Sequence, residues 1–325
     1  MSPGSMGPPG AEALSCYTAN LAVYLAHHRA DALGRIARSV RLAVRTDMSV
    51  PAYSHHAVAL NDVDGHSHLA YAAAPDVDAA LTAIGAELRE QGLVLVVSNT
   101  STMDWSASDK SAAPHFLLVD ARRRGEWHVD DRFLAPRPGG GERSYSAWIS
   151  RAVLARSLTP IVPLPHHQRL RNVHAFGLPV PVPPDDQIQW LTRSRQPPPA
   201  AGLPGRWVTD IADVIDLLEA FWSDAQAFQV RTPFLDDMWA AAQHHTFRYR
   251  HVRAERPPTG ADLAAVEEAI LAWQDLPMAL NFAASSHLRG RPRPSVVKAT
   301  FERLREAELR GRAIAAGLGY AHPDP

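Results

Sequence analysis

The sequence predicts an α+β fold with helices first, an antiparallel sheet next and a mainly helical C-terminal region. Three observations support this order. Apolar residues near the N-terminus recur at helical spacing, short Val-rich runs follow in the middle, and helical patterns return after a proline-rich stretch. The 325 residues suffice for a core domain and a second, helical domain.

Two helical patterns open the chain and a third precedes the predicted sheet. We expect the first helix over Tyr17–His28, with Ser15 as its N-cap and Cys16 at its positive end. The spacing of apolar residues predicts further helices over Asp31–Val44 and Asp76–Gln91.

The middle of the chain contains short apolar runs, which are typical of buried strands. The second and third runs flank the turn Arg122–Gly125 and predict a hairpin. The expected strands are Leu93–Val97, Phe116–Val119, Trp127–Val129 and two shorter ones near Thr159–Leu164 and Leu178–Val182.

The proline-rich run Gln196–Pro199 marks a boundary between two domains. We expect a core domain at about 11–205, a helical domain at about 206–316, and flexible tails at 1–10 and 317–325. The helical domain is predicted from the runs Asp210–Gln229, Phe234–Tyr249, Asp262–Trp273 and Ser295–Ala316.

Composition narrows the function classes. The net charge is −1, from 33 basic and 34 acidic residues, so we expect neither a nucleic acid nor a membrane surface as partner. No run approaches the roughly 20 apolar residues of a membrane helix. The segment Met1–Gly10 lacks the basic and apolar regions of a signal peptide, so a reducing, cytoplasmic location is expected. The sequence gives no indication of oligomeric state.

The only cysteine, Cys16, excludes an internal disulfide and any site with several cysteine ligands. Its position at a helix start favours the thiolate, which is the nucleophilic form. A base can come from elsewhere in the chain, and His115 opens the second strand of the predicted sheet. Asp130 and Asp131 end the next strand, where one of them can orient the imidazole.

We therefore expect a Cys16–His115–Asp130 site, with Asp131 and Asn99 as alternates for the orienting residue. A lone cysteine is more often a small core residue, and the spacing alone leaves the catalytic and the structural interpretation open.

Several segments resemble motifs of the butirosin-biosynthesis H-type N-terminal family, which consists of papain-like proteins related to C39 peptidases. The resemblance covers about residues 14–135 and rests on the order of its motifs. These are Ser-Cys-Tyr-Thr-Ala-Asn-Leu-Ala from residue 15, Gly-Leu-Val-Leu-Val-Val from residue 92, Pro-His-Phe-Leu-Leu-Val-Asp from residue 114, and Trp-His-Val-Asp-Asp from residue 127.

The resemblance implies a papain-like fold and a cysteine-dependent acyltransferase of natural-product biosynthesis. Cys16 would take an acyl group from a thioester on an acyl carrier protein and pass it to a small-molecule amine, forming an amide. The chain would need no cofactor of its own, because 4′-phosphopantetheine arrives on the carrier. The alternatives are a cysteine peptidase or amidase, and an inactive papain-like binding module.

The oxyanion hole and the substrate contacts are less clearly marked in the sequence. No Gln occurs in the ten residues before Cys16, so the backbone N–H groups of Cys16 and Tyr17 are the expected oxyanion donors. Thr18 is a candidate substrate contact. Asp104 and Trp105 lie where related proteins carry substrate-contacting loop residues, and a surface turn explains them equally well.

Four pairs of adjacent histidines are candidates for metal ligands. Adjacent side chains point to opposite faces of a strand, and they diverge by about 100° on a helix. They are therefore poor chelators, and we expect no metal site. The pairs are His27–His28, His55–His56, His166–His167 and His244–His245.

Overall fold

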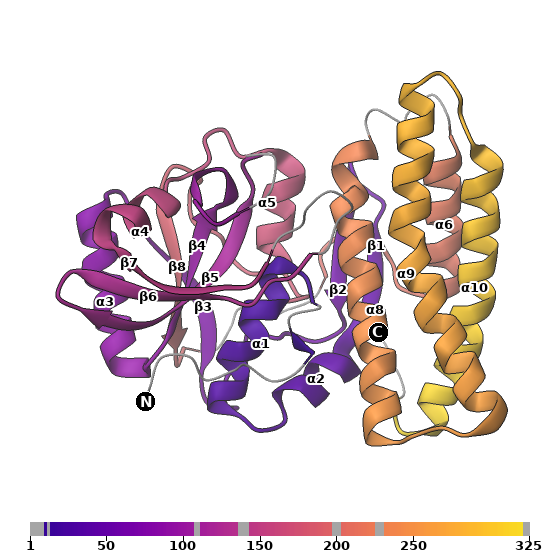
Figure 1. Cartoon of the computed structure of the whole chain (residues 1–325), viewed down its shortest axis with the longest axis horizontal. Coiled ribbons are helices and arrows are strands. Elements are labelled where there is room, and N and C mark those ends of the chain that lie inside the picture. The colour runs from indigo at the N-terminus through magenta and orange to yellow at the C-terminus, as the bar shows by residue number, and fades with distance from the viewer. Residues whose placement is uncertain are drawn as a thin grey trace. The chain divides into compact units, whose positions relative to one another are not determined.

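A computed structural model describes residues 10–11, 14–106, 111–135, 143–196, 203–224 and 231–320 (Figure 1). These residues form an α+β structure with antiparallel sheets and a helical C-terminal region, which confirms the predicted fold class at this level. The chain divides into two compact units. The first comprises Met1–Leu33 and Ala59–Gly202, and the second comprises Gly34–Val58 and Leu203–Pro325.

The first unit contains a six-stranded antiparallel sheet, in the order β3-β8-β4-β5-β6-β7. The strands β4 and β5 lie at its centre, and most of their residues are buried. The strands are β3 (His68–Ala74), β4 (Val94–Asn99), β5 (Pro114–Arg123), β6 (Glu126–Asp131), β7 (Tyr145–Ser150) and β8 (Ile188–Ser194).

Helices pack against both faces of this sheet (Figure 1). Because side chains alternate along a strand, Leu117 and Val119 share one face of β5, where they pack with Ile84 of α3. Phe116 lies on the opposite face, and its ring meets Tyr17 of α1 edge to face. The helices of this unit are α1 (Cys16–His28), α3 (Val77–Gln91), α4 (Arg151–Ser157), α5 (His166–Val173) and the short η2 (Thr100–Thr102).

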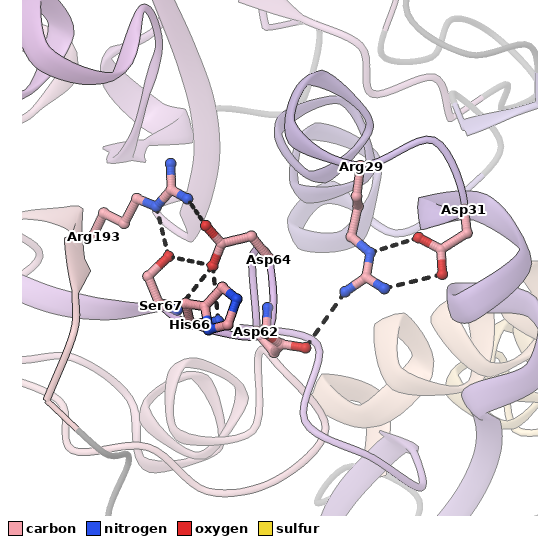
Figure 2. A network of polar contacts seen from close by, with 8 residues as sticks. Arg29, Asp31, Asp62, Asp64, His66, Ser67 and Arg193 are labelled. Atoms are coloured by element: carbon pink, nitrogen blue, oxygen red, sulfur yellow. Dashed lines mark hydrogen bonds and ion pairs between the residues drawn. The ribbon is translucent and has the colours of Figure 1, made fainter.

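A polar network fixes the C-terminal end of α1 and the loop before β3 (Figure 2). Arg29, the C-cap of α1, pairs with Asp62 at 3.4 Å. Arg193 of β8 donates to the Ser67 hydroxyl at 2.6 Å and pairs with Asp64 in the same loop. The loop is thereby tied to both the helix and the sheet.

The second unit combines a three-stranded sheet, in the order β2-β1-β9, with long helices. The helix α9 packs against α8 and α10, and α10 also packs against α6. The elements are α2 (Ala32–Ser39), which begins just before this unit, β1 (Val40–Arg45), β2 (Ala52–His56), β9 (Trp207–Val208), α6 (Ile211–Ser223), η4 (Thr232–Phe234), α8 (Leu235–Glu255), α9 (Gly260–Leu288) and α10 (Pro294–Gly317). No helix in the described ranges is both long and apolar enough to cross a membrane.

Capping residues and glycines in the sequence predicted the ends of some helices well. The third predicted helix is α3, whose N-cap Asp76 accepts from the backbone N–H of Ala79. It ends at Gly92, which adopts the left-handed conformation that a glycine permits (φ 82°). The first helix begins one residue earlier than expected, at Cys16, with Ser15 as its N-cap.

Other predictions were wrong. The helix expected over Asp31–Val44 ends at Ser39, and the chain continues as the buried strand β1. The strands expected at Thr159–Leu164 and Leu178–Val182 are not formed, apart from an isolated bridge at Leu178. Both segments are rich in proline, which lacks the N–H that a sheet requires.

The two compact units divide the chain differently from the predicted domain limits. Gly34–Val58 was expected in the domain at 11–205, and it belongs to the second unit. Most of the predicted boundary Gln196–Pro199 and most of both predicted tails lie outside the described residues. Within the C-terminal tail, Tyr320 is described and is buried.

We expect Leu117→Ala to lower the free energy of unfolding by about 2–5 kcal/mol, because Leu117 is fully buried between the sheet and α3. Urea unfolding followed by tryptophan fluorescence measures this. Leu134→Ala is the control, since Leu134 is exposed and should cost less than about 1 kcal/mol. Equal costs would contradict the assigned core.

Candidate active site

Cys16 is the first residue of α1 and is half-buried. Ser15 precedes it in extended conformation, and its hydroxyl oxygen accepts from the backbone N–H of Thr18 at 3.5 Å. The sulfur therefore lies at the positive end of the helix dipole, where a negative charge is favoured.

His115 lies near the start of β5 and is 3% exposed. Its Nε2 lies 2.8 Å from the Oδ2 of Asp131. Cys16 also hydrogen-bonds to this imidazole. The structure thus brings Cys16, His115 and Asp131 together.

The two ionisable partners of this triad alter each other's pKa. Burial by itself would lower the pKa of His115, but the charge of Asp131 and its hydrogen bond, together with the contact to Cys16, raise it from 6.5 to about 10. Burial by itself would raise the pKa of Asp131, and the charge and hydrogen bond of His115 instead lower it. The ring is therefore an imidazolium at neutral pH.

Asp131 is held from the side opposite to His115. The side chain of Asn20, on α1, donates to its Oδ1 at 3.0 Å, and the backbone N–H of Phe133 donates to the same oxygen at 3.1 Å. Asn20 also donates to the carbonyl of Phe116 and accepts from the backbone N–H of Arg132. A fully buried amide thus links the helix that carries Cys16 to the strands that carry His115 and Asp131.

The carboxylate that lies beside His115 is that of Asp131, whereas the sequence analysis had expected Asp130 there. Directly opposed residues of two strands point to the same face. Leu118 of β5 opposes Asp130, so Asp130 lies on the face of Leu118. His115 is three residues from Leu118 and lies on the other face, which Asp131 shares. Asp130 instead pairs with Arg132 at 2.7 Å.

A register shift between Val119 and Ala121 causes this exchange. Near the turn, Arg123 opposes Glu126 and Ala121 opposes His128. Continued without interruption, that register would place Asp130 opposite Val119 and on the face of His115. The extra residue, Asp120, moves the pairing by one and brings Asp131 to that face. The carboxylate of Asp120 is bonded to His128 at 2.6 Å.

Asn99, the other alternate, has a different role. Its side-chain oxygen accepts from the backbone N–H and the hydroxyl of Ser101, and its amide group donates to the carbonyl of Thr159. It therefore caps the short helix η2, and none of these bonds reaches the imidazole of His115.

The proposed substrate contacts are not gathered around the triad. Thr18 is buried, and its hydroxyl accepts from that of Ser15, so it completes the helix cap. Asp104 forms an ion pair with Arg156 of α4. Trp105 stacks on Tyr145 of β7, with ring centroids 4.5 Å apart. The surface-turn interpretation of Asp104 and Trp105 thus has the better support.

The expected oxyanion donors are at the start of α1. The first N–H groups of an α-helix have no acceptor within the helix and point along its axis. Cys16 and Tyr17 occupy these positions, and the phenol of Tyr17 is bound to Asn172 of α5. Tyr17 is thereby fixed at the site through its side chain, while its main chain is the candidate donor.

Sequence reasoning did not assign Asn20 its role as the link to Asp131. The available signal was its position, four residues after Cys16 and therefore one turn along the same face of the helix. Across the described part of the chain, no group of three or more His, Cys, Asp or Glu side chains could hold a metal ion.

Comparison with known proteins adds no identification: no protein-family model matches the chain, and no curated protein matches it. The chemistry of the site therefore has to be judged from its own geometry.

We expect Asp131→Asn to slow alkylation of Cys16 by iodoacetamide about tenfold or more at neutral pH. The amide removes the charge that holds His115 in place and protonated, so the imidazole no longer assists the reaction of the sulfur beside it. Because Cys16 is the only cysteine, mass spectrometry reads this reaction at one position. Asp130→Asn is the matched control and should react at nearly the wild-type rate. Equal slowing of both variants would contradict the assigned pair.

The pairing of His115 with Asp131 also predicts that the stability of the protein depends on pH. The pKa of folded His115, about 10, lies above its ordinary value of 6.5. Its contribution is therefore fully present below pH 6.5 and is lost as the pH rises toward 10. The contribution from the lowered pKa of Asp131 is lost only as the pH falls through the acid range.

We thus expect the stability difference between the wild type and Asp131→Asn to shrink as the pH rises from about 6 to about 10. Urea unfolding at several pH values measures it. The corresponding difference for Asp130→Asn should stay level over this range. A level profile for both variants would exclude the imidazolium–carboxylate pair.

Proposed function

We propose that this chain is a papain-like, cysteine-dependent acyltransferase related to the butirosin-biosynthesis H-type N-terminal family. It takes an acyl group from a carrier-protein thioester and passes it to an amine. The observation that carries the proposal is the contact of Cys16 with His115, whose Nε2 is held by Asp131. A thiol at a helix start, a base and a buried carboxylate are the parts that covalent acyl transfer requires.

The surroundings of the triad support the papain-like interpretation. The helix that bears Cys16 packs against an antiparallel sheet, and the base and its carboxylate come from neighbouring strands of that sheet. The link through Asn20 fixes the helix relative to both strands. Such fixed geometry is what converts a collision between thiol and base into an intramolecular proton transfer.

The proposed reaction has two halves. The sulfur of Cys16 attacks the thioester carbonyl carbon, and the bond to the pantetheine sulfur breaks. That sulfur leaves with a proton from His115. The neutral amine then attacks the acyl-cysteine and loses its proton to His115, and Cys16 leaves as the thiolate. The product is an amide, and the enzyme returns to its starting state.

The absence of a side-chain oxyanion donor ahead of Cys16 favours a thioester over a peptide as substrate. The ten preceding residues include neither Gln nor Asn. A thioester is the more reactive acyl donor and needs less stabilisation of its oxyanion than an amide does. Backbone N–H groups at the start of α1 are the donors that this proposal assigns.

Incubation of the protein with an acyl N-acetylcysteamine thioester tests the first half of the reaction. We expect intact-mass spectrometry to detect one acyl adduct, which is absent in Cys16→Ala. His115→Gln should form the adduct at least about a hundredfold more slowly, since it lacks the imidazolium that protonates the leaving sulfur. Asp130→Asn is the folded control and should be labelled like the wild type.

Adding a primary amine to the acylated protein tests the second half. Appearance of the amide supports the transferase. Release of free acid alone would assign the protein to the cysteine hydrolases. If the folded wild-type protein forms no adduct with any thioester, the enzymatic proposal is wrong, and a binding module with a papain-like fold becomes the better explanation.

A further inference from the structure

The helix α9 of the second unit has 29 residues and packs against both α8 and α10 (Figure 1). Its inner face is buried and largely apolar. Its outer face is exposed, and three large apolar side chains lie there. They are Leu271, Met278 and Phe282, of which 58%, 64% and 50% is exposed. These three residues are called the outer stripe of α9 below.

The outer stripe follows from the repeat of the helix. Successive residues of an α-helix turn by about 100°, so residues four or seven positions apart return to nearly the same side. Leu271, Met278 and Phe282 therefore lie within about 40° of one another around the axis of α9. They form one apolar line about 17 Å long, rather than three separate exposed residues.

Ion pairs mark the two sides of the outer stripe. On one side, Glu267 pairs with Arg253 of α8 at 3.5 Å. On the other side, Asp275 pairs with Arg303 of α10. Roughly half of each of these four side chains is exposed, so both pairs lie at the surface. The outer stripe thus lies between them and faces away from both neighbouring helices.

The composition of α9 around the stripe differs from that of its neighbour α10. The segment Leu276–Ser286 of α9 contains no Asp, Glu, Lys or Arg. On α10, by contrast, exposed positions carry charges at Lys298, Glu302, Arg303, Arg305, Glu306 and Arg310. Single exposed apolar residues are ordinary, whereas a contiguous group rimmed by polar residues is typical of an interaction surface.

The charges at the two ends of the outer stripe are opposite. Glu267 and Arg289 lie eleven residues before and after Met278, and eleven residues bring a side chain back to within about 20° of the same side. Both charges therefore lie in line with the stripe. Arg289 is exposed and has no ion-pair partner among the described residues. The acidic end and the basic end of the same line are thus both available to a partner.

A second copy of α9, laid antiparallel on the first, matches this surface. With Met278 of each copy at a two-fold axis, Glu267 of each copy faces Arg289 of the other. Phe282, one turn past the axis, faces the space between Leu271 and Met278 of the second copy. Apolar residues then meet at the centre and opposite charges meet at both ends, as an isologous interface requires. A parallel arrangement would place like charges together.

We propose that the outer stripe of α9 is a homodimer interface, in which two copies of the chain pack α9 against α9 in antiparallel direction about Met278. The inference is independent of the chemistry proposed for Cys16. Three large side chains make a small interface, below the roughly 800 Å² per partner of a standard one. We therefore expect a dissociation constant in the micromolar range, so that the dimer depends on protein concentration.

Sedimentation velocity of the protein between roughly 1 and 300 μM tests the dimer. We expect the wild type to shift from monomer to dimer over this range. Met278→Glu should raise the dissociation constant about tenfold or more, because two carboxylates would meet at the axis. Met278 is exposed, so the variant should fold, and thermal melting checks this.

Leu309→Glu is the matched control, since it introduces the same charge at an exposed apolar residue of the same unit. Leu309 lies one turn after Arg305, which pairs with Asp216 of α6, and is therefore on the side of α10 that faces α6. This variant should dimerise with the dissociation constant of the wild type.

Exchange of the end charges tests the antiparallel direction. Glu267→Arg and Arg289→Glu should each raise the dissociation constant about threefold or more, because like charges then face each other at both ends. The double variant Glu267→Arg/Arg289→Glu restores opposite charges between the two copies. It should dimerise more tightly than either single variant.

A wild type that stays monomeric throughout this range overturns the inference and leaves the outer stripe to a different partner. A dimer that Met278→Glu leaves intact, or that Leu309→Glu weakens equally, has its interface elsewhere and also overturns it. A double variant that is no tighter than the single variants contradicts the antiparallel arrangement. Adduct formation at Cys16 tests the proposed function separately from all of these outcomes.

Discussion

The site depends on the register between two neighbouring strands. The extra residue in β5 moves the pairing by one, and a shift of one residue exchanges the faces to which successive side chains point. Asp131 thereby comes to His115, while Asp130 turns to Arg132. The side chain of Asn20 then donates a hydrogen bond to the same carboxylate. The buried carboxylate of Asp131 therefore joins α1 to the sheet.

This dependence explains which features of the site could be predicted from the sequence alone. The N-cap Ser15 and the end of α3 at Gln91 follow from local signals and were predicted correctly, and the start of α1 was misplaced by one residue. His115 was placed on the correct strand because the apolar run Phe116–Val119 follows it directly. The choice between Asp130 and Asp131 required the register, which arises from a bulge that no local pattern in the sequence marks.

The errors in the predicted helices and strands have a similar origin. The run from Val40 to Arg45 fits both helical spacing and strand alternation, and packing within the second unit decides for a strand. The strands β3 and β8 pair along their whole length, yet their sequences contain few of the long Val-rich runs that signal a buried strand. The role of Asn20 depends on contacts with strands about a hundred residues away, which spacing within one helix cannot predict.

The solitary thiol has a consequence for the protein under oxidising conditions. A half-buried sulfur next to an imidazolium is the kind of cysteine that peroxide converts to sulfenic acid. Many proteins rescue that species by condensing it with a second cysteine of the same chain. This chain has no second cysteine, so recovery of the reduced form requires a thiol from outside, and without one the damage proceeds to irreversible sulfinic acid.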